Sequence, residues 1–239
     1  MIRTTLAAAA VATTLGAVAA PPAGAASYPK IEQLVVFRDS TVIQKTATAK
    51  QVTARVEGGR DCAVGSATGL AALVRIKPPK LRIHDYGACS TRARDAEQLF
   101  VRGMGPDINK GFDGWVWKVG QKLATAGAGD PGGPFGRGRL KDGQRVTWFY
   151  CRLVQQSCQR TLAVKATSTT PGQVSVTVRS YDDRGKSVPA AGATVRAGDV
   201  TATTDDNGAA TLTLPAGTHR VHAERTGEIR SFAERVQVG

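Results

Sequence analysis

The sequence predicts a mainly β protein with a mixed α+β front half and an all-β rear half. Residues 114–120 and 140–150 alternate apolar and polar side chains, as half-buried strands do, and together they hold all three tryptophans. The front half offers one short helix candidate. The rear half shows short alternating runs that recur about every eight to twelve residues between turn signals, a spacing typical of small sandwiches.

The front half begins with a predicted hairpin. Residues 34–37 and 41–44 are two apolar runs joined by the polar tripeptide 38–40, and residues 52–59 contain a further predicted strand that ends in two glycines. These segments supply the first strands of a front sheet, in which the tryptophan-containing segments would be the last.

One helix is predicted after these strands, over residues 70–74. Ser66 or Thr68 can cap it, because a hydroxyl oxygen accepts a hydrogen bond from the free amides of the first turn. Pro78 and Pro79 disfavour helical geometry at and before them, so the helix must end by Lys77. A hairpin, one helix and a series of strands is the order that a β-grasp-type sheet requires.

The rear half is predicted to be a small antiparallel β-sandwich. Turn residues at 182–186 and 205–208 separate its alternating runs. The predicted strands are residues 174–178, 193–195, 200–203, 210–214, 219–223 and 233–238.

The chain is expected to divide into a signal peptide and two domains. Residues 1–25 carry one arginine, an alanine-rich apolar run and a small-x-small ending, which is typical of a secretory signal. A front domain over 29–166, a linker over 167–173 and a rear domain over 174–239 follow, because the composition shifts at the small polar and breaking residues of 167–172.

The front domain resembles a known family in the segment 114–150. The order of a glycine–tryptophan strand, a glycine-containing loop, Asp142-Gly143 and a closing strand is similar to the transcobalamin-like C-terminal domain, a β-grasp-type domain of unknown function. The resemblance implies a β-grasp-type sheet with one short helix. We do not expect cobalamin binding, because the sequence contains no predicted α-barrel domain of the kind that accompanies this module in vitamin B12 carriers.

The loop over residues 124–139 is longer than the resemblance implies. It contains six glycines and two prolines, Pro131 and Pro134. Phosphate-binding loops end in lysine and a hydroxyl residue at a helix start, a pattern that is missing here. We therefore expect an Ω-like or disordered loop.

The rear domain resembles carboxypeptidase regulatory-like and bacterial immunoglobulin-like modules. The resemblance rests on the order of Pro189, the Gly192–Val195 segment, Thr204-Asp205, Gly208 and Pro215-Ala216-Gly217. It implies a spacer or adhesion unit on an exported protein.

The cysteine count favours disulfides. Four cysteines in a chain with a predicted secretory signal point to an oxidising compartment, and three pairings are formally possible. We expect Cys62–Cys89 and Cys151–Cys158, because each pair is close in sequence. Neither pair has the spacing of a structural zinc site, so we expect no metal and no cofactor.

Charge distinguishes the two halves. The net charge is +13; residues 26–171 hold 23 basic and 11 acidic residues, whereas residues 172–239 hold 8 of each. A basic front domain suggests an anionic polymer of the cell envelope as a partner, with another exported protein as the alternative. The basic residues are dispersed, so solubility and a general arginine bias are the competing interpretation of the charge. A nucleic acid partner is not favoured, and no segment is apolar for long enough to span a membrane.

Candidate catalytic residues are scarce. His84 and Asp85 are neighbours, and His219 and His222 have an odd spacing, so in strands each pair would point to opposite faces. We therefore expect no catalytic residues and no enzyme activity. In the 114–120 strand, alternation places Trp115 and Trp117 on one face and Lys118 on the other. The candidate ligand-binding residues are the two tryptophans and nearby cations: Trp115, Trp117, Lys118, Arg137 and Arg139. Core packing of the tryptophans is the competing interpretation.

These observations predict a secreted, non-enzymatic binding or surface-display protein with a basic front domain and a sandwich spacer. The alternatives are a soluble carrier of a small hydrophobic or corrinoid ligand, and an accessory subunit that docks to another exported protein.

Overall fold

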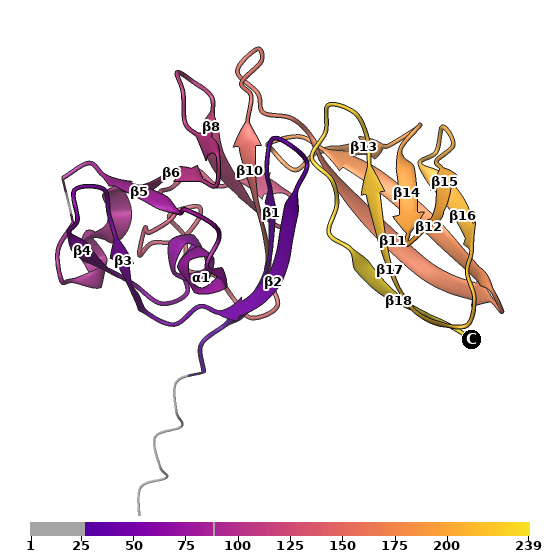
Figure 1. Ribbon diagram of the computed structural model, residues 1–239, viewed down its shortest axis with the longest axis horizontal. Helices are drawn as coiled ribbons and strands as arrows, with labels where there is room; N and C mark the ends of the chain where they lie inside the picture. The colour runs from indigo at the N-terminus through magenta and orange to yellow at the C-terminus, as the bar shows by residue number, and fades with distance from the viewer. Residues whose placement is uncertain (1–26, 88) are drawn as a thin grey trace, which may run out of the picture.

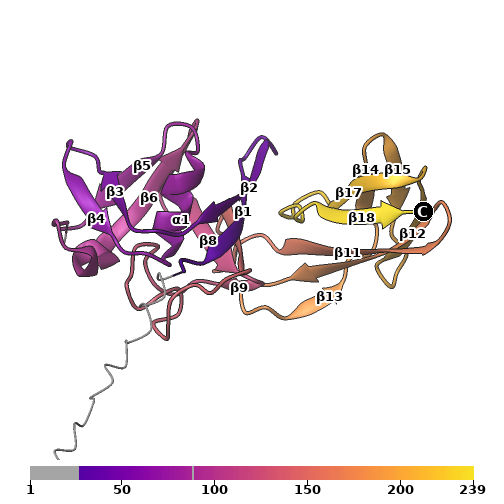
Figure 2. The same cartoon turned by 90° about the horizontal axis from the view of Figure 1, so that it is seen from below.

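A computed structural model describes residues 27–87 and 89–239. The predicted signal peptide, residues 1–25, lies outside these residues. Two domains lie side by side, with the hairpin at the start of the front domain turned toward the rear domain (Figures 1 and 2). The protein is mainly β with a small helical content, as the sequence predicts.

The front domain is built on a five-stranded sheet of order β2-β1-β10-β8-β9. Its central pair, β1 and β10, is parallel, and the other neighbours are antiparallel. A parallel central pair flanked by an N-terminal hairpin makes this a β-grasp-type sheet. Its strands are β1 (Lys30–Val36), β2 (Val42–Thr48), β8 (Gly114–Val119), β9 (Lys122–Leu123) and β10 (Arg145–Cys151).

The predicted helix is confirmed as α1 (Gly69–Ile76), which packs on one face of the sheet. The hydroxyl of Thr68 caps it by accepting a hydrogen bond from the amide of Ala71 at 3.2 Å. It ends at Lys77, which adopts a left-handed conformation ahead of the two prolines. Its apolar face is buried, including Leu70 and Leu73.

The front domain also contains two smaller sheets beyond the helix. One is the hairpin of β3 (Val52–Arg55) and β4 (Asp61–Val64); the other joins β5 (Arg82–Asp85), β6 (Leu99–Met104) and β7 (Asp107–Ile108). A short 3₁₀ helix, η1 (Ala93–Gln98), precedes β6. No helix or strand was predicted from the sequence over residues 93–98 and 99–104, which form η1 and β6.

The rear domain is a sandwich of two four-stranded antiparallel sheets, as predicted. Valines alternate along β12 with their side chains in the core: Val174, Val176 and Val178. The first sheet contains β11 (Thr161–Thr170), β12 (Gln173–Tyr181), β13 (Ser187–Pro189) and β16 (Ala209–Thr213), and the second contains β14 (Thr194–Ala197), β15 (Val200–Thr203), β17 (Gly217–Glu224) and β18 (Glu234–Val238).

The domain boundary lies earlier than the expected linker at 167–173. Residues 161–170 form β11, which pairs with β12 across a turn, and Leu162 and Val164 are buried in the core of the sandwich. Small polar residues at 167–170 suggested a linker, but they form the end of β11, an edge strand of the four-stranded sheet, where most side chains are exposed. The chain passes between the domains over residues 152–160.

A third apolar cluster forms the joint between the domains. Alternate residues of β1 and β10 point away from α1, and among them Leu34, Val36 and Phe149 contact Ile229 and Phe232 of the loop between β17 and β18. Both faces of the central front-domain strands are therefore buried, one under α1 and one against the rear domain.

Both expected disulfides are present, Cys62–Cys89 and Cys151–Cys158. Cys151 ends β10, so the second disulfide holds the start of the interdomain segment against the front sheet. Among the described residues, none of the helices is long and apolar enough to cross a membrane.

Candidate functional site

An apolar cleft of about 270 Å³ opens on the side of the front domain. We call it the aromatic cleft. Four aromatic rings contribute to its wall, and a short backbone segment closes it. Its lining is Phe100, Val101, Trp115, Val116, Trp117, Trp148 and residues 123–128.

The three tryptophans are core residues that reach the cleft only by an edge. Trp115 and Trp117 are 7% and 6% exposed. Trp117 stacks on Trp148, with ring centroids 5.4 Å apart and planes 13° apart. The Nε1 of Trp115 donates to the carbonyl of Asp107 at 2.9 Å. Most of the surface of the tryptophans is therefore packed in the core. Only the small exposed part could contact a ligand.

Gly69 lets the helix approach the tryptophans closely. A Cβ atom added there would lie 2.6 Å from the ring of Trp117. The side chain of Gln33 connects the same layers, since it accepts from the Nε1 of Trp148 at 3.2 Å and donates to the carbonyl of Ala72 at 2.8 Å. These contacts fix the tryptophan rings that form the floor of the aromatic cleft.

The glycine-rich loop over 124–139 is a folded wall of the cleft, of the Ω-like kind that the sequence allowed. The amides of Thr125 and Ala126 both donate to the carbonyl of Pro134, at 2.9 and 3.2 Å. The carbonyl of Ala128 accepts from the amide of Leu70 at 2.7 Å, which attaches the loop to the first turn of α1. Gly127 has no room for a side chain, because an added Cβ would lie 2.3 Å from the carbonyl oxygen of Glu97.

Phe100 forms the exposed lip of the aromatic cleft. It lies on β6 and is 44% exposed, and its ring makes an edge contact with Tyr86 at 5.2 Å. Phe100 was not among the residues suggested by the sequence, because Leu99, Phe100 and Val101 form a continuous apolar run that does not show which side chain is exposed.

The three predicted cations do not line the aromatic cleft. Arg137 and Arg139 are exposed on the loop, and the Nε of Arg139 donates to the carbonyl of Pro131 at 3.1 Å. Lys118 is fully buried and lies on the opposite face of the sheet from Trp115 and Trp117. The structure therefore brings the tryptophans together and separates them from the basic residues.

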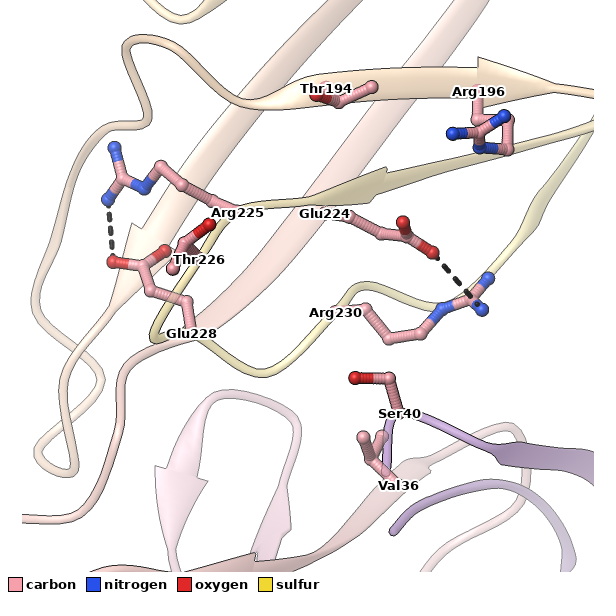
Figure 3. A pocket seen from close by; sticks show the side chains of 9 residues that line it. All are labelled: Val36, Ser40, Thr194, Arg196, Glu224, Arg225, Thr226, Glu228 and Arg230. Atoms are coloured by element: carbon pink, nitrogen blue, oxygen red, sulfur yellow. Dashed lines mark hydrogen bonds and ion pairs between the residues drawn. The ribbon is translucent and has the colours of Figure 1, made fainter. Parts of the chain in front are cut away.

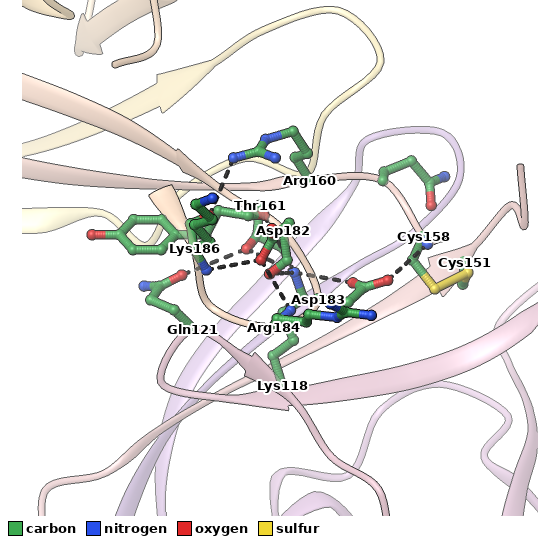
Figure 4. Close-up of polar contacts among 12 residues, drawn as sticks. Lys118, Gln121, Cys151, Cys158, Arg160, Thr161, Asp182, Asp183, Arg184 and Lys186 are labelled. Carbon is green, nitrogen blue, oxygen red and sulfur yellow. Dashed lines mark hydrogen bonds and ion pairs between the residues drawn. A yellow bond between two sulfur atoms is a disulfide. The ribbon is translucent and has the colours of Figure 1, made fainter. Parts of the chain in front are cut away.

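The side chain of Lys118 reaches the rear domain and makes polar contacts with its residues (Figure 4). Its Nζ donates to the carbonyls of Tyr181 and Asp182 at 3.4 and 3.0 Å and to the hydroxyl of Thr161 at 3.3 Å. The Oδ1 of Asp183 lies 3.3 Å from Nζ, an ion pair in distance although this oxygen accepts no hydrogen bond from the described residues. Burial lowers the pKa of Lys118, and the charge of Asp183 opposes that shift.

The histidines are held by local contacts in three separate places. His84 Nδ1 lies 3.1 Å from a carboxylate oxygen of Glu57, His219 Nε2 lies 2.8 Å from the carbonyl of Pro215, and His222 Nε2 lies 3.1 Å from Glu224. No group of three or more potential metal ligands occurs within residues 27–87 and 89–239.

The fold and this cleft define a class: a two-domain β protein in which a β-grasp-type domain with an apolar side cleft is fixed to a β-sandwich. No protein-family model, curated protein or solved structure matches the chain in the comparisons. The transcobalamin-like and immunoglobulin-like resemblances therefore stay expectations from the sequence.

Proposed function

We propose that the protein is a secreted, non-enzymatic binding protein whose front domain holds a small, flat, apolar ligand in the aromatic cleft. The observation that carries the proposal is the lining of that cleft, which combines the exposed ring of Phe100 with three buried tryptophans. Ligand pockets are concave and mainly apolar, and aromatic rings supply much of their contact area. The volume of about 270 Å³ suits a ligand of one or two fused rings.

The construction of the cleft supports a preformed site. Its floor is held by the Trp117–Trp148 stack and its wall by the bonds from Thr125 and Ala126 to Pro134. A rigid site loses little conformational freedom when a ligand enters, which favours binding. Polar groups that could orient a reacting substrate are sparse in the lining, which suits binding without turnover.

Two further features support the secreted, displayed part of the proposal. Both cysteine pairs are oxidised, as is usual outside the cytoplasm. The joint fixes the two domains, since the guanidinium of Arg145 pairs with Glu32 of the front sheet and with Glu234 of the rear sheet. A fixed sandwich can act as a spacer that presents the front domain.

Binding of N-phenylnaphthylamine, a neutral dye that fluoresces in apolar sites, tests the proposal. We expect saturable dye emission together with quenching of tryptophan emission by energy transfer, because the three rings lie at the cleft. Phe100→Ser should weaken dye affinity by about 5- to 30-fold, which corresponds to the loss of about 1–2 kcal/mol of apolar contact.

Phe112→Ser is the matched control. Phe112 is 92% exposed and does not line the aromatic cleft, so its replacement should leave dye affinity unchanged. Equal affinity in the two variants, or dye binding without tryptophan quenching, would contradict the proposal.

Docking to another exported protein is a second candidate function. It is favoured by the exposed rings of Tyr86 and Phe112, which are 66% and 92% exposed and line one shallow hollow beside Phe100. Under this alternative Phe112→Ser abolishes capture of the partner protein, whereas under the leading proposal it has no effect on ligand binding.

A further inference from the structure

A second cleft, of about 310 Å³, lies between the two domains (Figure 3). We call it the interdomain cleft. The turn between β1 and β2 forms its front-domain side, through Val36 and Ser40. The rear-domain side comes from β14, the end of β17 and the loop that follows: Thr194, Arg196, Glu224, Arg225, Thr226, Glu228 and Arg230.

One end of the rear-domain side carries two arginines, of which only Arg230 has an acidic partner among the described residues. Arg196 is exposed and makes no ion pair with any described residue. The side chain of Arg230 is only 18% exposed; its Nη1 lies 3.4 Å from Glu224, and its Nε is buried without a hydrogen-bond partner in the described structure. Burial lowers the pKa of Arg230, Glu224 opposes this, and the charge of Arg196 adds to the lowering. An anionic group here would relieve the repulsion between the two guanidinium groups.

The other end of the rear-domain side carries a carboxylate, that of Glu228, with an unsatisfied acceptor oxygen. The side chain of Glu228 is 10% exposed, and its Oε1 accepts from the hydroxyl of Ser180 at 2.8 Å and from Arg225 at 2.6 Å. Its Oε2 is buried and accepts no hydrogen bond from any described residue. Leaving a buried carboxylate oxygen unpaired costs free energy, so this oxygen favours a cationic donor.

A ligand with a charge of only one sign cannot satisfy both the arginine pair and the Glu228 carboxylate. A simple anion would leave the Oε2 of Glu228 unpaired, and a simple cation would meet two guanidinium groups. We propose that the interdomain cleft binds a small zwitterion, with its carboxylate on the guanidinium groups of Arg196 and Arg230 and its ammonium group on the carboxylate of Glu228. An amino acid or a dipeptide has this chemistry and a size that fits the cleft.

Hydroxyl groups complete the lining. Those of Ser40, Thr194 and Thr226 line the cleft and could contact the ligand. Ser40 has a positive φ of 68° in the turn of the front-domain hairpin, which faces Arg230 across the cleft (Figure 3). The ligand would therefore contact both domains. This site is separate from the aromatic cleft and does not depend on the function proposed for it.

Isothermal titration of the purified protein with alanylalanine tests the proposal. We expect saturable binding with one site. N-acetylalanylalanine lacks the ammonium group and alanylalanine amide lacks the carboxylate, and each should bind about tenfold or more weakly, since one charge-assisted hydrogen-bond set is lost. No binding of the dipeptide up to about 10 mM, or equal binding of the three compounds, overturns the proposal.

Arg196→Gln locates the site. It should weaken binding of the dipeptide about tenfold and leave binding of the amide unchanged, because only the carboxylate contact is removed. Arg220→Gln is the control: Arg220 is an exposed arginine of the same sheet that does not line the interdomain cleft. Because Arg196 is exposed and unpaired, its replacement should not disturb folding. Dipeptide binding that is equal in the two variants overturns the assignment.

Discussion

The ammonium group of Lys118 lies 3.3 Å from the Oδ1 of Asp183, and the two residues belong to different domains. Lys118 leaves the front sheet on the face opposite the tryptophans and is fully buried. Its Nζ also donates to two carbonyls of the β12–β13 turn region, those of Tyr181 and Asp182. A residue that the sequence suggested as a ligand contact therefore connects the two domains.

Lys118→Met should lower the free energy of unfolding by about 2–4 kcal/mol. The variant keeps the length of the side chain but leaves the carbonyls and the Asp183 carboxylate without their cation. The loss lies at the low end of the range for buried ion pairs, because the side chain of Asp183 is 20% exposed. Urea unfolding followed by circular dichroism measures the change.

Lys165→Met is the control for that variant, because Lys165 is an exposed lysine on β11. We expect a change within about 0.5 kcal/mol for it. The double variant Lys118→Met/Asp183→Asn should lose less stability than Lys118→Met alone, since no uncompensated charge is then left at the joint. A Lys118→Met protein as stable as the Lys165→Met protein would show that the contact does not hold the domains.

The two disulfides should differ in their contribution to stability. Cys62–Cys89 spans 27 residues and Cys151–Cys158 spans 7. On the chain-entropy model the longer loop stabilises by about 3–4 kcal/mol and the shorter by about 2–3 kcal/mol. Paired alanine variants, Cys62→Ala/Cys89→Ala and Cys151→Ala/Cys158→Ala, compared by urea unfolding, test this order. The reverse order would mean that burial of Cys151 in the joint outweighs chain entropy.

Gly69→Ala should destabilise the protein although alanine favours helices. An added Cβ would lie 2.6 Å from the ring of Trp117, which cannot move because it stacks on Trp148. We expect a loss of about 1–3 kcal/mol from overpacking. At Gly65 an added Cβ would meet its nearest atom at an ordinary 3.6 Å, so Gly65→Ala serves as the control and should be nearly neutral. Similar midpoints in urea for the two variants would refute the close packing of α1 on Trp117.

Stability should fall on mild acidification because of His222. Burial lowers the pKa of His222 from its ordinary value of 6.5, the charge of Arg230 adds to this, Glu224 opposes it, and Arg196 lowers it further. The unfolded chain therefore binds the proton more tightly than the folded protein does. The free energy of unfolding consequently decreases as the pH falls from 6.5 to the folded pKa, and becomes level below it.

His222→Gln should flatten this part of the pH profile, because glutamine does not titrate. Urea unfolding between about pH 7 and pH 5 measures the slope, and NMR titration of the imidazole gives the folded pKa directly. A wild-type stability that rises on acidification through this window, or a variant with the wild-type slope, would contradict the assignment.

Local patterns in the sequence were sufficient for most elements of the fold. The hydroxyl of Thr68 and the prolines after Lys77 bound α1, and period-two alternation identified β8, β10 and β12. These features act over a few residues, which is why they can be read without tertiary contacts. The two cysteine pairings also follow from closeness along the chain.

The sites could not be predicted in the same way. Alternation placed Trp115 and Trp117 on one face and Lys118 on the other, but it could not show that each face would be covered. The aromatic cleft needs Phe100 beside Trp115, and the interdomain cleft needs Ser40 beside Arg230. Such contacts join residues that are far apart in the chain and depend on how the layers pack.

The sequence by itself determined the class of each domain, the presence of one helix that ends by Lys77 and the expected disulfide pairs, because capping, alternation and cysteine spacing are local properties. Only the tertiary structure decided that β11 belongs to the rear domain, that Lys118 is buried at the joint, and that two clefts form. The physical reason is that burial is decided by the partner surface: Leu34 and Phe149 are covered because Ile229 and Phe232 pack on them.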